Sequence, residues 1–88
     1  MEVIVLYRER SDHAREVREY IREFTRRTGK ELTTLDVDTV EGAEKAKLYD
    51  ILQYPAVIAV KSDGQMLQLW QGQPLPLIND VAGYTVEQ

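Results

Sequence analysis

The chain of 88 residues contains no cysteine. This absence excludes disulfide bonds, zinc–thiolate sites, iron–sulfur clusters and every reaction that needs a thiol nucleophile. The chain also has a single histidine, His13, so a transition-metal site would have to be built mainly from carboxylates. The sequence therefore predicts no metal site, and we expect no cofactor.

Long apolar runs are missing as well. A membrane-spanning helix needs about 18 consecutive apolar residues, and no segment of this chain approaches that length. The chain begins with Met1-Glu2 followed by an apolar strand-like segment, without a basic leader. We expect a cytoplasmic protein that does not bind membranes, folded as one domain over residues 1–88.

Charge is unevenly distributed along the chain. The net charge is −4, yet all the arginines lie between Arg8 and Arg27, so the remaining segments are acidic. Nucleic-acid binding needs a net basic surface, and binding to single strands also uses aromatic side chains on which bases stack. The chain as a whole is acidic, residues 8–30 carry a local charge of only +3, and no aromatic platform accompanies the arginines. The sequence therefore argues against nucleic acid as a partner.

The N-terminal half alternates between strand and helix patterns. Residues 3–7 form a continuous apolar run, which is typical of a strand covered on both faces. The next segment repeats apolar residues at intervals of three and four, which predicts a helix that ends at Gly29. Residues 32–37 are expected to form a second strand, followed by a polar turn ending at Gly42. A short helix over 43–50 is expected to bury Ala43, Ala46 and Tyr49.

The C-terminal half begins with a break at Tyr54-Pro55, because the residue before a proline is pushed into extended geometry. A buried strand over 56–60, a turn at Asp63-Gly64 and a strand over 65–71 follow, and then a short helix near the end. The element order is β-α-β-α-β-β-α. A right-handed crossover makes the first two strands parallel neighbours, and the hairpin adds the other two strands on the opposite side. The fold class is α/β with a four-stranded mixed sheet.

Leu35-Asp36-Val37-Asp38, the segment 46–56 ending in Tyr54-Pro55-Ala56, and the later Asp63-Gly64 resemble the thioredoxin family. The resemblance covers nearly the whole chain and implies a thioredoxin-like fold with a cis peptide bond before Pro55. In that family a Cys-x-x-Cys motif lies between the first strand and the first helix. Here the corresponding stretch is 10–15, Arg-Ser-Asp-His-Ala-Arg. Without a thiol, dithiol oxidoreductase activity is excluded.

Ser11, Asp12 and His13 are the residue types of a nucleophile–acid–base set. Sequence neighbours at a helix start point in different directions, however, whereas a triad needs mutual hydrogen-bond reach. The favoured interpretation is that Ser11 or Asp12 caps the helix by accepting a bond from a backbone N–H, and that His13 is solvated. We therefore expect no catalytic residue and a protein that is not an enzyme.

An alternative function uses the same corner of the fold. A helix N-terminus has free N–H groups and the positive end of a dipole, and Arg8 and Arg10 add charge beside it. This corner could hold an anion such as glutathione. By resemblance to glutathione transferases, which share the fold, Ser11 would stabilise the thiolate of glutathione or another small thiol.

Tyr54-Pro55 is the principal candidate for function. In thioredoxin-like proteins, the backbone of the residue before the cis-proline pairs with an extended partner peptide as an added strand. That interaction needs no cysteine. The resemblance thus implies a non-redox module that binds a protein or peptide, with Tyr54-Pro55 and the loop 11–13 framing the groove. The alternative is that Pro55 only shapes the start of the strand and Tyr54 merely packs.

A third hypothesis is a structural domain that associates with itself. Arg15, Arg18, Arg22 and Arg26 form a basic stripe along the first helix and could dock onto an acidic surface of another copy. Interleaved glutamates favour a solvated face of salt bridges instead. Trp70 lies on the expected edge strand, where it could form a pairing surface. We expect the last helix to cover it.

Overall fold

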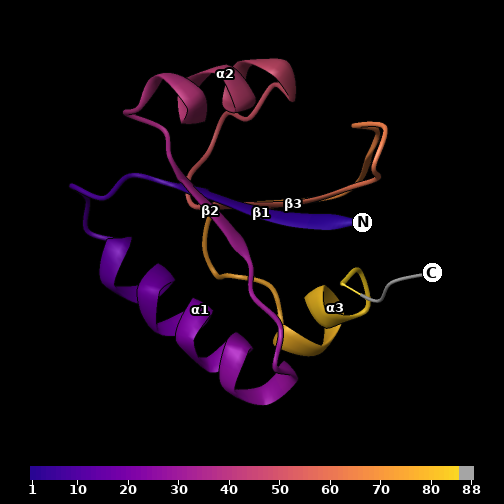
Figure 1. The fold of residues 1–88 in the computed structure, drawn as a ribbon. Coiled ribbons are helices and arrows are strands. Elements are labelled where there is room, and N and C mark those ends of the chain that lie inside the picture. The colour runs from indigo at the N-terminus through magenta and orange to yellow at the C-terminus, as the bar shows by residue number, and fades with distance from the viewer. Residues whose placement is uncertain (86–88) are drawn as a thin grey trace.

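The computed structural model describes residues 1–85, within which four strands and three helices follow one another in the order β-α-β-α-β-β-α that the sequence predicts (Figure 1). The elements are β1 (Glu2–Tyr7), α1 (Ala14–Thr28), β2 (Thr33–Asp36), α2 (Val40–Leu48), β3 (Ala56–Val60), β4 (Met66–Gln71) and α3 (Ile78–Ala82). None of these helices is long and apolar enough to cross a membrane.

The strands form one mixed sheet in the order β2-β1-β3-β4. β1 is parallel to β2, while β3 is antiparallel to both β1 and β4. This is the predicted arrangement, with the β1-α1-β2 crossover on one side and the hairpin on the other. Figure 1 shows the sheet nearly edge-on, with α2 on one face and α1 and α3 on the other.

Side chains that alternate along the central strands divide the core into two layers. Val3 and Val5 of β1 face the layer under α1 and α3, whereas Ile4 and Leu6 face the layer under α2. Every residue of β3 is buried, because a core layer covers each face of this central strand. The continuous apolar runs in the sequence therefore correspond to strands covered on both faces.

Trp70 of β4 lies in the layer under α1 and α3, as predicted. Its ring meets the ring of Tyr84, just after α3, edge to face at a centroid distance of 5.6 Å. Both side chains pack against the buried cluster that contains Phe24. The side chain of Trp70 is therefore partly buried against the core and is not an exposed aromatic group on the edge strand.

The start of α2 differs from the sequence prediction. Thr39 caps the helix by accepting a hydrogen bond from the N–H of Gly42 at 3.1 Å, so the helix begins at Val40 instead of residue 43. Gly42 is thus inside the helix, and the buried face consists of Gly42 and Ala46. Ala43, which was expected to be buried, is exposed. The prediction failed because a glycine was taken to end the turn, whereas the preceding threonine starts the helix.

Gly42 occupies the closest approach between α2 and the end of β2. A Cβ atom at this position would lie 2.0 Å from the carbonyl oxygen of Asp36, far inside van der Waals contact. The contact is with backbone, so a side-chain rotation cannot relieve it. Helix α2 can pack this closely on the sheet only because residue 42 has no side chain.

We expect Gly42→Ala to lower the free energy of unfolding by about 2–3 kcal/mol, the usual cost of overpacking a closed site. Gly83→Ala is the matched control, because its Cβ would lie 3.6 Å from the nearest neighbouring atom, the carbonyl oxygen of Asp80, which is an ordinary packing distance. The control should be neutral or slightly stabilising. Urea unfolding followed by the fluorescence of Trp70 measures both, and equal effects would contradict the packing argument.

Tyr20 on α1 has a buried hydroxyl without a hydrogen-bond partner among residues 1–85. Burial raises the pKa of this phenol to about 12, and the carboxylate of Asp80 contributes to the increase. An unsatisfied buried polar group costs about 1–3 kcal/mol. The hydroxyl is therefore a local weakness in the contact between α1 and α3.

Tyr20→Phe should raise the free energy of unfolding at pH 7 by about 1 kcal/mol, because it removes the unsatisfied hydroxyl. The pKa of Tyr20 in the fold, about 12, lies above the value of about 10 for an unfolded tyrosine. The protonated phenol thus favours the folded state below pH 10, and this contribution is lost as pH rises towards 12. The wild type should lose stability more steeply than the variant over that range in urea titrations. Identical slopes would refute the assignment.

Candidate functional site

The loop after β1 is held by hydrogen bonds to the backbone of Arg8. The N–H of Arg8 donates to Nε2 of His13 at 3.1 Å, and its carbonyl accepts from Oγ of Ser11 at 2.6 Å. Both bonds close the chain back on itself within one short segment. Ser11 and His13 therefore build the loop that leads into α1.

These bonds correct the predicted helix cap. The N-cap residue of α1 is His13, and no side chain caps the helix there. Ser11 does not accept from a helical N–H, because its hydroxyl is turned back to the Arg8 carbonyl, a local pattern in which serine competes with helix capping. His13 is half-buried and bonded rather than simply solvated. For Ser11 to stabilise a bound thiolate, its hydroxyl would first have to give up the hydrogen bond that it donates to the carbonyl of Arg8.

The side chain of Arg8 joins three segments of the chain. Its guanidinium lies 2.6 Å from Oδ1 of Asp38, which follows β2, and sits over the ring of Tyr54 with 5.5 Å between Cζ and the ring centroid. Both members of the ion pair are about half exposed, so the pair itself adds little stability. Its effect is to place the loop after β1 beside Tyr54.

A second set of contacts ties the same loop to α1. Glu9 accepts a hydrogen bond from the hydroxyl of Tyr7 at 2.5 Å and forms an ion pair with Arg18. The bond to Glu9 is the main reason that the pKa of Tyr7 rises to about 12. Arg18 is therefore engaged in positioning the loop.

Tyr54-Pro55 has the cis peptide bond that the family resemblance implies. Pro55 is fully buried, and its carbonyl accepts from the N–H of Gly72 at 2.9 Å. Oε1 of Gln71 accepts from the N–H groups of Leu52 and Gln53 at 2.8 and 3.2 Å. Among residues 1–85, by contrast, no hydrogen bond engages the backbone N–H or C=O of Tyr54.

A groove of about 360 Å³ lies beside Tyr54, between α2 and the segment that connects it to β3. Its wall is mixed in character, with exposed Leu52 on one side and charged groups nearby. The lining residues are Arg8, Val37, Ala43, Ala46, Lys47, Asp50, Ile51, Leu52 and Tyr54. A larger hollow, of about 610 Å³, lies near Met1 at the opposite end of β1, away from this corner.

The structure thus brings together Arg8, Ser11, His13, Tyr54 and Pro55 among the residues singled out in the sequence. Arg10 and Asp12 belong to the same loop but are exposed, and within residues 1–85 they form no ion pair or side-chain hydrogen bond. The described residues also contain no cluster of histidines and carboxylates that could hold a metal ion.

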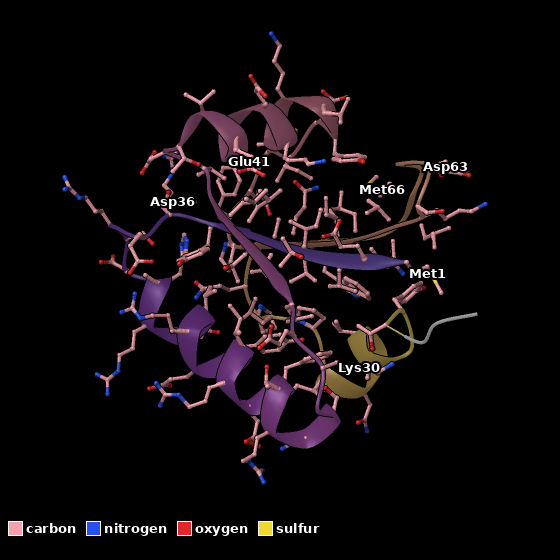
Figure 2. All side chains as sticks on the ribbon, viewed as in Figure 1. Met1, Lys30, Asp36, Glu41, Asp63 and Met66 are labelled. Carbon is pink, nitrogen blue, oxygen red and sulfur yellow. The ribbon has the colours of Figure 1, made fainter. Side chains whose placement is uncertain are left out.

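Asp38 is a member of the site that the sequence analysis missed. The signal was present: β1 and β2 are parallel, so the residues that follow them meet at the same edge of the sheet. Arg8 follows β1, and Asp38 follows β2. Tyr7 pairs with Asp36, so Arg8 and Asp38 lie one and two residues beyond the paired ends, and opposite charges that close favour an ion pair. Figure 2 shows the end of β2, marked by Asp36, close to the start of α2 near Glu41.

Two arginines of the basic stripe on α1, Arg15 and Arg26, form ion pairs within the helix, and Arg18 pairs with Glu9 outside it. Arg15 pairs with Glu19 at 3.3 Å, and Arg26 and Arg27 both pair with Glu23, at 2.6 and 3.0 Å. The hydrogen bond from Arg26, together with Arg27, lowers the pKa of Glu23 to about 2. These contacts confirm the interpretation as a solvated, salt-bridged face.

No family model and no curated protein matches the sequence. Among solved structures, thioredoxin 1 from the thermophilic eubacterium Thermosipho africanus TCF52B is similar, with a TM-score of 0.65 and 12% identity over 96% of this chain and 89% of that chain. A malarial protein is also similar, with a TM-score of 0.68 and 20% identity over 96% of this chain and 93% of that one. The chain therefore has a thioredoxin-like fold, and it carries this fold without cysteine.

Proposed function

We propose that this chain is a non-redox thioredoxin-like protein that binds an extended segment of a protein or peptide partner. The binding corner consists of Tyr54-Pro55 and the loop 8–13. The observation that supports the proposal is the position of Arg8, whose guanidinium lies over the ring of Tyr54 and pairs with Asp38. These contacts hold the loop and Tyr54 together as one surface.

Main-chain recognition would take place at Tyr54. Its N–H and C=O are free of hydrogen bonds among residues 1–85, although the neighbouring Leu52, Gln53 and Pro55 are all bonded. An extended peptide lying along this position can form backbone hydrogen bonds like those of an added strand. Such pairing fixes the direction of a peptide without requiring a particular sequence.

Side-chain recognition would come from the groove beside Tyr54. Leu52 on its rim is 84% exposed, which is unusual for a large apolar residue and leaves a contact for an apolar side chain. The charged groups in the same wall, Arg8, Lys47 and Asp50, are of both signs, and Arg8 is already paired with Asp38. The preferred ligand is thus an extended segment that places an apolar side chain beside Leu52.

The proposal can be tested with peptides selected from a random phage-displayed library on the immobilised chain. Adding such a peptide to ¹⁵N-labelled protein should shift the amide signals of residues 8–13, 37–38 and 50–56. Arg8→Ala should weaken binding about tenfold, because it removes the contact that holds the loop against Tyr54 and is worth on the order of 1 kcal/mol.

Arg22→Ala is the matched control, since Arg22 is exposed on α1 and lies outside the groove. It should bind the selected peptides as the wild type does. Circular dichroism would establish that both variants are folded. Selection that yields no binding peptide, shifts confined to other surfaces, or equal affinities for the two variants would each count against the proposal.

A further inference from the structure

A long uncharged segment stands out in an otherwise highly charged chain. Aspartate, glutamate, lysine and arginine together make up 30% of the residues, yet none occurs from Gly64 to Asn79. Burial does not explain this, because much of β4 is exposed, including Met66 at 37% and Leu67 at 41%. Surfaces that lack charge in this way are typical of the centres of protein interfaces.

β4 is also an edge strand, because within residues 1–85 its single neighbour in the sheet is β3. Edge strands are usually kept from pairing by charged side chains, prolines or short length. The opposite edge, β2, is only four residues long, ends in Asp36, and has Thr33 bonded to Glu2. β4 is six residues long and contains neither a charged residue nor a proline.

The pairing of β4 with β3 determines which backbone groups point outwards. Gly72 donates to the carbonyl of Pro55, and hydrogen bonding alternates along an antiparallel pair. Gln68 and Trp70 therefore bond to β3, whereas Leu69 and Gln71 direct their N–H and C=O groups to the open edge. The N–H of Leu69 indeed donates away from β3, to Oε1 of its neighbour Gln68 at 3.0 Å.

One irregularity lies at the hairpin end of the strand. Val60 pairs with Met66 and Ala59 with Gln68, so Leu67 is an extra residue in a β-bulge. Figure 2 shows Met66 near the turn marked by Asp63. The bulge leaves residues 68–71 as a regular edge that can accept another strand.

We propose that β4 pairs antiparallel with β4 of a second copy of this chain. A two-fold axis then joins the two four-stranded sheets into one, and the outward groups of Leu69 and Gln71 bond to the same groups of the other copy. Each copy carries a net charge of −4, so two copies repel each other over most of their surfaces. The uncharged edge of β4 allows them to meet without bringing like charges together. A partner that is recognised through charged side chains finds no opposite charges on this edge. The uncharged β4 strand of a second copy, in contrast, matches it.

Short edge pairing buries little area, so the dimer should be weak, with a dissociation constant on the order of 10 μM. Sedimentation equilibrium of the full chain from about 1 to 500 μM should show a monomer–dimer equilibrium. Gln68→Lys and Leu67→Lys place like charges along the pairing edge and should each weaken the dimer by up to about fivefold. Thr34→Lys, an exposed position on β2, adds the same charge on the other edge and should leave the constant unchanged.

A monomer at all concentrations would overturn the proposal, and so would equal effects of Gln68→Lys and Thr34→Lys. Because the chain has no cysteine, a single introduced cysteine gives a unique spin-label site. In the dimer, labels at Leu67→Cys should lie about 15–20 Å apart, because the two copies of this residue are offset by four to six residues along the paired strands, at about 3.4 Å per residue. Labels at Thr34→Cys should lie more than about 30 Å apart, on opposite sides of the joined sheet. The reverse pattern would assign the contact to β2.

Discussion

The register between β1 and β3 determines where the candidate site lies. Leu6 is the partner of Ala56 in this antiparallel pair, so continuing the register by two residues places Arg8 opposite Tyr54. Both strands are buried on both faces, and a shift by one residue would turn every apolar side chain into the wrong layer. The core thus fixes the register, and the register brings the loop after β1 to Tyr54-Pro55.

The parallel pairing of β1 with β2 supplies the other half of the site. Tyr7 of β1 pairs with Asp36 of β2, so the segments that carry Arg8 and Asp38 follow the two strands at the same end of the sheet. Gly42 then allows α2 to pack against the end of β2, because its missing side chain makes room for the Asp36 carbonyl. The groove beside Tyr54 is a consequence of this packing, since α2 forms one of its walls.

The sequence was informative where burial decides the structure. Continuous apolar runs identified β1 and β3, and spacing by three and four residues identified α1, because each pattern follows from covering a strand or a helix face. Local polar contacts were harder to predict. Ser11 can bond to a helical N–H or to the carbonyl of Arg8, and Thr39 competes with Gly42 as a boundary signal. These choices differ by about 1 kcal/mol and depend on neighbours that the linear sequence does not order.

The position of Gln71 connects the binding corner to the open edge. Its backbone groups point outwards from β4, while its side chain accepts hydrogen bonds from Leu52 and Gln53, the two residues before Tyr54. A strand paired along β4 would restrict the backbone of Gln71 and so steady the segment that carries Tyr54. A peptide bound at Tyr54 would in turn order the same segment and, through Gln71, the edge. Because any coupling between two binding events is reciprocal, each of the proposed interactions should strengthen the other.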